Sequence, residues 1–264
     1  MTRLGVRLVA VVGFVLLIAP LLAVIVNAFN ADELLSGWGG FTTRWFTDTV
    51  NDPEIRASAG RSVQVAAAVT AISTIIGTIA VAFSAYVAAP VRRLTDGLTV
   101  ARVMMPGVIL AAGLVILFPA VHVPFGLNAV ILGQVVWAAA IFIVIAGARR
   151  AGFDRSLEDA ARDLGASPFR VLRTLVIPDL LPGIAAGALL VFTFSFDDVV
   201  TPVFLAGSGT PTLPVTILAR IHRGITPAIN AVGVLVMLVT LSGLALSTLF
   251  AGSPLAGLRG RKVT

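Results

Sequence analysis

Long intervals without a charged side chain divide this sequence into hydrophobic stretches separated by short polar segments. A helix needs about 20 apolar residues to cross the roughly 30 Å hydrocarbon core of a bilayer. The charge-free intervals contain 24, 30, 46, 17 and 35 residues and span 8–31, 62–91, 103–148, 180–196 and 224–258. This pattern is typical of a chain that crosses a membrane several times as helices.

The longest interval holds two spans, because Pro119, Pro124, Gly126 and Asn128 form a turn signal near its middle. The pattern therefore predicts an all-α, polytopic membrane protein made of a single transmembrane domain over 1–264. Its six predicted helices cover about 8–29, 63–89, 101–121, 128–148, 182–200 and 228–250.

Two segments leave an alternative open. Residues 1–28 begin with a basic stretch and contain a small-residue site at Val26–Ala28, as a cleaved signal peptide does. The apolar run is longer than the 7–15 residues of a signal core, so we expect an uncleaved first helix. Residues 199–219 carry no charge, yet their prolines and glycines would leave backbone amides unpaired in lipid. We expect an outer loop that dips into the protein rather than a seventh span.

Composition narrows the class of protein further. Hydrophobic residues make up 58% of the chain, charged residues 12%, and the mean hydropathy is +1.01. A soluble domain carries about 25% charged residues, so soluble, disordered and nucleic-acid-binding proteins are excluded. The absence of cysteine excludes disulfides and thiolate chemistry, and His122 and His222 lack metal-ligand spacing. Since Lys262 is the single lysine, near the end of the chain, a phosphate-binding loop is excluded and any ATP is hydrolysed by another subunit.

The net charge of +6 gains meaning when the basic residues are sorted by side. With a cytoplasmic N-terminus, six spans put both termini in the cytoplasm, with 14 basic residues inside and five outside, as the positive-inside rule requires. The inner set is Arg3, Arg7, Arg92, Arg93, Arg102, Arg149, Arg150, Arg155, Arg162, Arg170, Arg173, Arg259, Arg261 and Lys262. The outer set is Arg44, Arg56, Arg61, Arg220 and Arg223.

Two kinds of residue within or near the spans have structural interpretations. Small residues let helix backbones approach closely in a membrane, and we assign packing alone to Ser73, Gly77, Gly183, Gly187, Ser242 and Gly243. Tryptophan is enriched at membrane interfaces, so we predict anchoring roles for Trp38, Trp45 and Trp137.

The segment 149–179 is the one long polar stretch on the predicted inner side. Its apolar residues recur at helical spacing and form a stripe that the membrane would leave uncovered: Leu157, Ala160, Ala161 and Leu164. A stripe of this kind requires a protein partner.

The same segment contains start and stop signals for two short helices. Ser156, with an acidic residue three positions on, resembles a capping start of the first helix. Gly165 can end it in a left-handed turn, and Pro168 can open the second helix. Pro178 and Pro182 then mark the start of span five.

These residues resemble a known motif. Asp159–Gly165 followed by Leu175–Pro178 is similar to the E-A-A-x-x-x-G … I-x-L-P motif of the permease subunits of binding-protein-dependent ABC importers. Asp159 replaces the glutamate of the motif, although Glu158 precedes it, and Leu175 and Ile177 exchange the order of isoleucine and leucine. The resemblance implies a type I importer permease fold and an ATPase-coupling role for Glu158, Asp159, Ala160, Ala161, Gly165, Ala166, Ser167, Pro168 and Pro178.

The resemblance also implies partners. A permease of this family pairs with a second permease subunit, two ATP-binding subunits and an extracytoplasmic solute-binding protein, and it lies in lipid without binding nucleic acid. ATP and Mg²⁺ belong to the partner ATPases, so no cofactor, metal or catalytic residue is expected on this chain.

Four further stretches are similar to the second permease subunit of spermidine/putrescine importers: 27–30, 40–46, 163–167 and 196–200. This similarity runs from the first span to about Val232 and implies polyamine import across a bacterial cytoplasmic (inner) membrane. Related permeases for iron, thiamine, phosphonate or amino-acid derivatives share much of the pattern, so those solutes are the alternative.

Asp197 and Asp198 are the one acidic pair at predicted membrane depth, where charges are usually functional. The 17 preceding residues rise only about 25 Å, so the acids lie near the outer edge of the bundle. Adjacent carboxylates attract a di- or polycation, and Phe194 and Phe196 can add cation–π contacts. Neighbouring residues project about 100° apart, so at most one acid faces the solute path directly. The alternative is that the pair caps the following loop.

Two other function classes lack their signatures. An intramembrane enzyme would need a motif such as H-E-x-x-H, which is absent. A secondary transporter or channel would need coupling or selectivity groups in the membrane, and the interiors of predicted spans one to four carry no charge.

Overall fold

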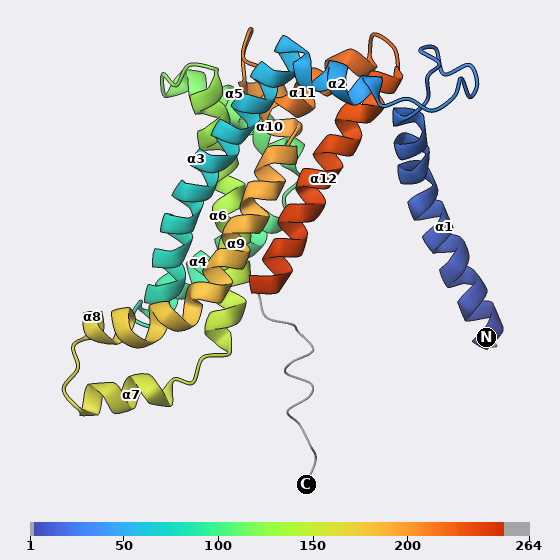
Figure 1. Cartoon of the computed structure of the whole chain (residues 1–264). Coiled ribbons are helices and arrows are strands. Elements are labelled where there is room, and N and C mark those ends of the chain that lie inside the picture. The colour runs from blue at the N-terminus through green and yellow to red at the C-terminus, as the bar shows by residue number, and fades with distance from the viewer. Residues whose placement is uncertain (1–2, 251–264) are drawn as a thin grey trace. The chain divides into compact units, whose positions relative to one another are not determined.

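The computed structural model describes residues 3–250, and every regular element among them is helical (Figure 1). The expected all-α fold is therefore confirmed. Arg259, Arg261, Lys262 and the predicted cytoplasmic C-terminus lie outside the described residues. The chain divides into two compact units, Met1–Ala59 with Leu213–Val239 and Gly60–Thr212 with Thr240–Thr264, and each is described separately.

Five helical stretches within residues 3–250 are long and apolar enough to cross a membrane, and the number rises to six if one bent pair of helices crosses as a single span. Four of the five agree with predicted spans to within a few residues at most ends, because the central part of each lies in a charge-free interval. They are α1 (Arg3–Ala28), α3 (Pro53–Phe83), α6 (Leu127–Ala151) and α12 (Pro227–Phe250). The α3 helix begins ten residues earlier and ends six residues earlier than predicted.

The third span differs from the single helix predicted over 101–121. Two helices, α4 (Ala89–Met104) and α5 (Gly107–Ala120), meet at an angle of 107°. Met105 is extended, with φ −74° and ψ 127°, because Pro106 disfavours helical backbone in the residue before it. The prediction treated Arg102 as the end of a polar loop and therefore missed α4.

The fifth span also begins earlier than predicted. The short helix α8 (Pro168–Val171), a π-helical turn η1 (Leu172–Val176) and α9 (Ile177–Asp197) form one continuous stretch. Pro178 lies in the first turn of α9, and the amide of Ile177 reaches back five residues to the carbonyl of Leu172. Pro178 has no backbone N–H to donate, and the π turn before it lets the helix continue without that hydrogen bond. The span therefore begins before this proline and not at it.

In the first unit, the end of α1 packs against α2 (Arg44–Asn51) and the start of α12. The shared core consists of Ala28, Trp45, Ala231 and Val234. The Trp45 indole N–H donates to the carbonyl of Asn30 at 2.7 Å, and Trp45 is buried, whereas Trp38 is exposed. The apolar window of α1, by contrast, has none of its residues buried in the structure.

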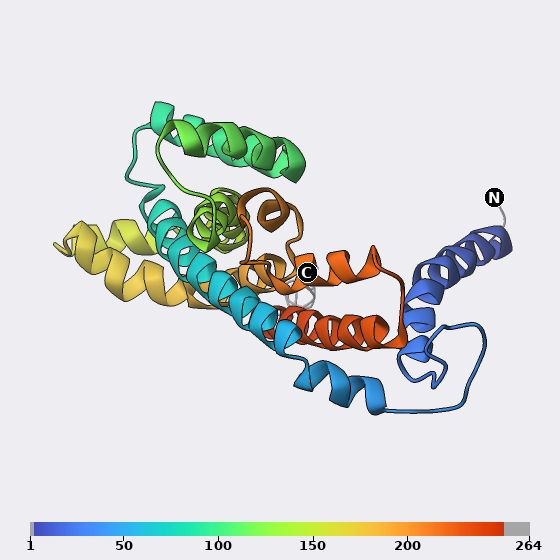
Figure 2. The same ribbon diagram turned by 90° about the horizontal axis from the view of Figure 1, so that it is seen from above.

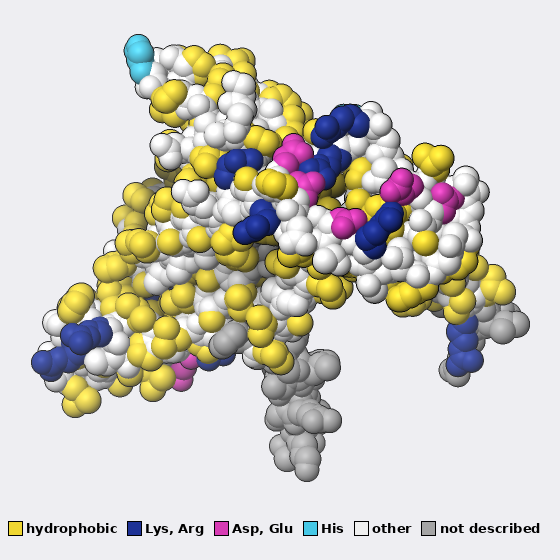
Figure 3. All heavy atoms as spheres, turned by 45° about the horizontal axis from the view of Figure 1, so that its top comes forward, with side chains coloured by type: hydrophobic (Ala, Val, Ile, Leu, Met, Phe, Trp, Pro, Cys, Tyr) yellow, Lys and Arg dark blue, Asp and Glu magenta, His cyan; other side chains and the backbone are white. Residues whose placement is uncertain are grey.

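Charged side chains of the first unit gather on one face, whereas the flanks of the helices are apolar (Figure 3). Arg220 of α11 (Leu213–Ile221) pairs with Asp52 at 2.8 Å and with Glu54 at 2.6 Å. Partial burial raises the pKa of Asp52, but hydrogen bonds from the Ile55 amide and Arg220 outweigh it and leave that pKa below its ordinary value. These contacts fix α11 to the start of α3.

The core of the second unit forms around Phe142 of α6, which is fully buried. Its ring rests against Gly77 of α3 on one side and Gly187 of α9 on the other. A Cβ on Gly187 would lie 2.9 Å from the ring, so glycine is required for this approach. Gly243 of α12 likewise meets Thr193 of α9, and the predicted close packing at these glycines is confirmed.

The uncharged stretch after Asp198 forms a short helix in the second unit, α10 (Val200–Leu205), rather than an irregular loop. It packs against α5 and α6, as Figure 2 shows from above. Leu205 is fully buried, and Gly133 of α6 lies so close that a Cβ there would be 2.8 Å from it. This helix is far too short to span a membrane, and it brings the residues after Asp198 against α6.

Candidate functional site: the segment 149–179 and the Asp198 pocket

The segment 149–179 forms the predicted helix–turn–helix, with α7 (Ser156–Asp163) joined to α8 (Figure 1). Gly165 has φ +81°, and the amides of Gly165 and Ala166 donate to the carbonyls of Arg162 and Ala161. This is the expected left-handed helix end. Nothing lies within 4 Å of a Cβ built on Gly165, so the backbone conformation alone requires glycine.

The predicted capping by Ser156 is wrong. The N-cap residue of α7 is Arg155, which makes no side-chain capping bond, and the carboxylate of Asp154 accepts a hydrogen bond from the Ser156 amide at 2.9 Å. Hydrogen bonds from the Ser156 hydroxyl and amide hold the pKa of Asp154 below its ordinary value. Ser167 caps α8 by accepting from the Arg170 amide at 3.4 Å, and Pro168 opens that helix as predicted.

Most of the apolar stripe of this segment is uncovered in the structure, and Phe169 of α8 is exposed as well. Leu157 is 50% exposed, Leu164 89% and Phe169 70%. Most residues predicted to couple to an ATPase share this exposure, namely Asp159, Ala160, Gly165, Ser167, Pro168 and Pro178. Ala161 and Ala166 are half-buried and pack against the core.

Glu158 differs from its neighbours, because its side chain is only 3% exposed. Glu158 Oε1 lies 2.6 Å from Nη2 of Arg150, the second-last residue of α6, whose side chain is 6% exposed. Glu158 Oε2 accepts from the Tyr86 hydroxyl at 3.1 Å and lies 3.5 Å from Nη2 of Arg162. Arg162 also stacks on the Tyr86 ring at 5.2 Å. We call these four residues the Glu158 cluster.

The Glu158 cluster is sensitive to single changes. Removing one member of a buried ion pair leaves an uncompensated charge and costs about 3–5 kcal/mol, whereas removing both charges together is often neutral. The neighbouring pair between Arg149 and Asp179, at 2.8 Å, is 47% and 29% exposed. An exposed pair contributes about 0–1 kcal/mol, so Arg149 and Asp179 are structurally similar but energetically minor.

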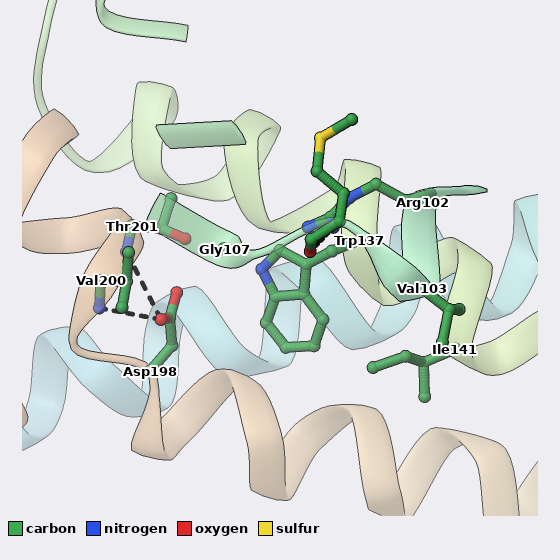
Figure 4. Close-up of a pocket in the computed structure, with 9 residues that line it drawn as sticks. Arg102, Val103, Gly107, Trp137, Ile141, Asp198, Val200 and Thr201 are labelled. Atoms are coloured by element: carbon green, nitrogen blue, oxygen red, sulfur yellow. Dashed lines mark hydrogen bonds between the residues drawn. The ribbon is translucent and has the colours of Figure 1, made fainter. Parts of the chain in front are cut away.

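A second site lies where the α4–α5 bend meets α6 and α10. A cavity of about 190 Å³ opens there (Figure 4). Its lining is mainly apolar and comprises Arg102, Val103, Met105, Gly107, Trp137, Ile141, Asp198, Val200 and Thr201. In Figure 4 the Trp137 indole stands between Asp198 on one side and Arg102 on the other.

Asp198 is held by donors from two elements. One carboxylate oxygen accepts from the amides of Val200 and Thr201, at 3.0 and 3.4 Å, and so caps α10. The other accepts from the side-chain amide of Gln134 at 2.9 Å. Gln134 is fully buried in α6, and its own carbonyl accepts from the Ser195 hydroxyl. Asp198 therefore caps the following segment, as our alternative expected, and also lines the pocket.

The other residues predicted for the solute path lie apart from this pocket. The Asp197 carboxylate accepts from the Thr240 hydroxyl of α12 at 2.7 Å. Phe196 is buried and stacks on Phe192, with ring centroids 6.3 Å apart, while Phe194 is 45% exposed. The two acids thus point to different partners, as the 100° angle between neighbours requires.

Arg102 and Trp137 also line the pocket, although the sequence pattern assigns neither of them to the solute path. The prediction places Arg102 at the cytoplasmic side of the membrane and Asp198 near the outer side. Residues that line one cavity cannot lie on opposite sides of the membrane, so these two placements are not both correct. Arg102 belongs to the bent span, so the expectation of uncharged spans one to four is wrong there. Its Nη1 donates to the Met105 carbonyl at 3.3 Å, while its buried Nε has no partner within residues 3–250.

Comparison with protein families decides the class. Residues 73–253 match the family described as "Binding-protein-dependent transport system inner membrane component". The chain belongs to this family. It is thus a multi-pass permease subunit of the binding-protein-dependent transport systems, with the expected type I importer permease fold.

Named relatives agree with this assignment. The chain is 33% identical to the putrescine transport system permease protein PotI of Escherichia coli (strain K12), over 87% of this permease and 84% of the relative. It is 31% identical to the spermidine/putrescine transport system permease protein PotC of the same strain, over 91% of each chain. The crystal structure of a bacterial ABC transporter involved in the import of the acidic polysaccharide alginate shares the fold, with a TM-score of 0.73, 13% identity and 94% coverage of both chains.

Proposed function

We propose that this permease is one of two membrane-spanning subunits of an ATP-driven importer for a polyamine such as putrescine or spermidine. A second permease subunit completes the solute path, two separate subunits bind and hydrolyse ATP with Mg²⁺, and an extracytoplasmic binding protein delivers the solute. This chain carries no ATPase site, because its one lysine is Lys262 and cannot belong to a phosphate-binding loop.

The observation that carries the proposal is the uncovered stripe on the segment 149–179. Leu157, Leu164 and Phe169 are exposed on a helix pair that lies mostly outside the apolar helices and is anchored to α6 by a buried ion pair. Water disfavours such a surface, so a partner subunit covers it in the working complex. The motif that this stripe belongs to is the coupling motif of importer permeases.

We place both termini and the segment 149–179 in the cytoplasm of a bacterial cell, and the permease in its inner membrane. Once Arg92, Arg93 and Arg102 are counted with the bent span, 11 of the remaining 16 basic residues lie on the predicted inner side. The positive-inside rule therefore still favours this orientation.

A polyamine is the solute that the relatives and the pocket jointly support. PotI and PotC are named for putrescine and spermidine. The amides of Val200 and Thr201 and the side-chain amide of Gln134 hold the Asp198 carboxylate at the pocket, and the face of Trp137 beside it attracts ammonium groups. Arg102 lines the same pocket, so an entering ammonium group meets a positive charge there as well as the carboxylate.

Uptake by the whole complex in proteoliposomes tests the proposal. The permease would be reconstituted with its second permease, its ATPase subunits and its binding protein, and given radiolabelled putrescine or spermidine. We expect uptake only with ATP inside and with all subunits present. Uptake by the permease alone would refute the proposal that it is one subunit of an ATP-driven importer. Uptake of iron or thiamine that neither polyamine inhibits would refute the proposal that the solute is a polyamine.

A further inference from the structure

The Glu158 cluster connects the segment 149–179 with two of the elements that line the Asp198 pocket. Arg150 is the second-last residue of α6, and Trp137 on the same helix lies 13 residues earlier, which corresponds to about 20 Å of helix. Tyr86 lies in the connection from α3 to α4, and α4 carries Arg102 in its last turn. The two elements that hold Glu158 are therefore the two that lead to the pocket.

Burial separates Glu158 from the docking surface. Its side chain is 3% exposed and that of Arg150 is 6% exposed, so neither can touch a subunit that covers the stripe. Asp159, the next residue, is 69% exposed and pairs with Arg162 of its own helix, at 2.9 Å. The two adjacent acids thus face different ways, one into the permease and one away from it.

We propose that the Glu158 cluster is a joint that transmits movement of α7 to the pocket, with Glu158, Arg150 and Tyr86 as positioning residues. Each carboxylate oxygen of Glu158 is held by a different element, Oε1 by α6 and Oε2 by the α3–α4 connection. Displacement of α7 therefore pulls at once on two of the elements that line the pocket, α6 and the connection that leads to α4. This inference rests on the proposed function, because α7 moves only if a partner ATPase displaces it.

The key variant is Tyr86→Phe, which removes one hydroxyl and keeps the ring that packs against the core and under Arg162. Tyr86 is the single tyrosine of the chain. A hydrogen bond to a charged group shifts a two-state population by about tenfold or more. We expect Tyr86→Phe to assemble with the ATPases and hydrolyse ATP, but to consume severalfold more ATP per putrescine imported.

Two further variants make the test decisive. Asp179→Asn breaks the neighbouring exposed pair between α6 and α9 and should leave the ATP consumed per putrescine unchanged. Glu158→Leu combined with Arg150→Met removes both buried charges, so that folding does not suffer from a lone charge. We expect this double variant to assemble and to remain uncoupled, because no carboxylate holds Tyr86.

A spectroscopic measurement separates this inference from the proposed function. The chain has no cysteine, so Ala148→Cys on α6 and Asp163→Cys on α7 can carry two spin labels in the full chain. We expect one narrow distance distribution by double electron–electron resonance, broadened by Tyr86→Phe and unaffected by Asp179→Asn.

The outcomes are distinct. If the unaltered complex imports no putrescine, the proposed function fails, whatever the spin labels report. Another outcome is that the unaltered complex imports putrescine while the Tyr86→Phe complex consumes the same amount of ATP per putrescine and gives the same distances between the labels. That result would refute the proposal that the Glu158 cluster transmits movement. A change in label distances with unchanged ATP per putrescine also refutes it, since the cluster would then hold α7 without transmitting its movement.

Discussion

Gly165 offers a prediction whose magnitude follows directly from the structure. Its φ of +81° lies in the left-handed region, and a Cβ there would meet no atom within 4 Å. Substitution therefore changes backbone strain alone, without any steric clash. An L-residue with a Cβ costs about 1–2 kcal/mol in this region, and a β-branched residue costs more.

We expect a graded series of Gly165 variants. Asparagine tolerates the left-handed region and should disturb the turn least, alanine should shift its population about five- to thirtyfold, and valine should shift it further. Because this turn sets the direction from α7 to α8, the same order should appear in the loss of ATP-driven putrescine uptake by the reconstituted complex. Thermal unfolding of each purified variant should show the same order.

Gly147→Ala is the matched control, because Gly147 also has open space around a built Cβ but lies within α6. Alanine is favoured over glycine by roughly 0.5–1 kcal/mol inside a helix, so this variant should be neutral or slightly stabilising. If Gly165→Val transported as well as the unaltered permease, or if Gly147→Ala lost as much activity, the strain argument would be wrong.

Three further predictions concern other parts of the permease. Gly187→Ala forces a methyl group to within 2.9 Å of the Phe142 ring, and overpacking of this kind should lower stability by about 1–3 kcal/mol in thermal unfolding. Asp198→Asn should raise the putrescine concentration needed for half-maximal uptake, because the charge beside the indole of the pocket is lost. Asp52 has a lowered pKa in the folded state, so its contribution is present above the unfolded value of 3.8 and is lost as the pH falls through the folded value. Asp52→Asn should remove that loss from an acid titration of unfolding, since the variant cannot pair with Arg220.

Each of these predictions has its own control. Gly113→Ala places a methyl group in open space and should leave the unfolding temperature close to that of the unaltered chain. Asp197→Asn tests specificity, because Asp197 lies outside the pocket, and an equal effect on uptake would contradict the role of Asp198. Asp48→Asn alters an exposed acid of the same unit, so an equal change in its acid titration would contradict the assignment to Asp52.

Uncharged length was enough to predict most of the spans, because lipid excludes charge from long helices whatever their neighbours are. The same rule failed at α4, whose charged residues Arg92, Arg93, Asp96 and Arg102 gave it the pattern of a polar loop. The bend at Pro106 was missed because one proline between two apolar runs has no signature that distinguishes a bend from a kink.

The candidate sites show a similar division. Local signals predicted the turn at Gly165, since the need for positive φ is set by neighbouring residues. The burial of Glu158 depends on Arg150 and Tyr86, which lie eight and 72 residues away, and no local pattern predicts such a contact. The sequence pattern predicts that Trp137 anchors the protein at the membrane interface. The sequence alone does not distinguish a tryptophan that contacts lipid from one that lines a cavity, as Trp137 does.

The π turn at Leu172–Val176 sets the helical phase between α8, which follows the turn after α7, and α9. A π turn contains one residue more than the α-helical turn it replaces, so deleting a single residue there restores ordinary α-helix. Everything before the deletion would then rotate by about 100° about the axis of α9. The direction in which the apolar stripe faces thus depends on the number of residues in this turn as well as on the side chains of the stripe. Distances between spin labels on α7 and α9 would show the rotation.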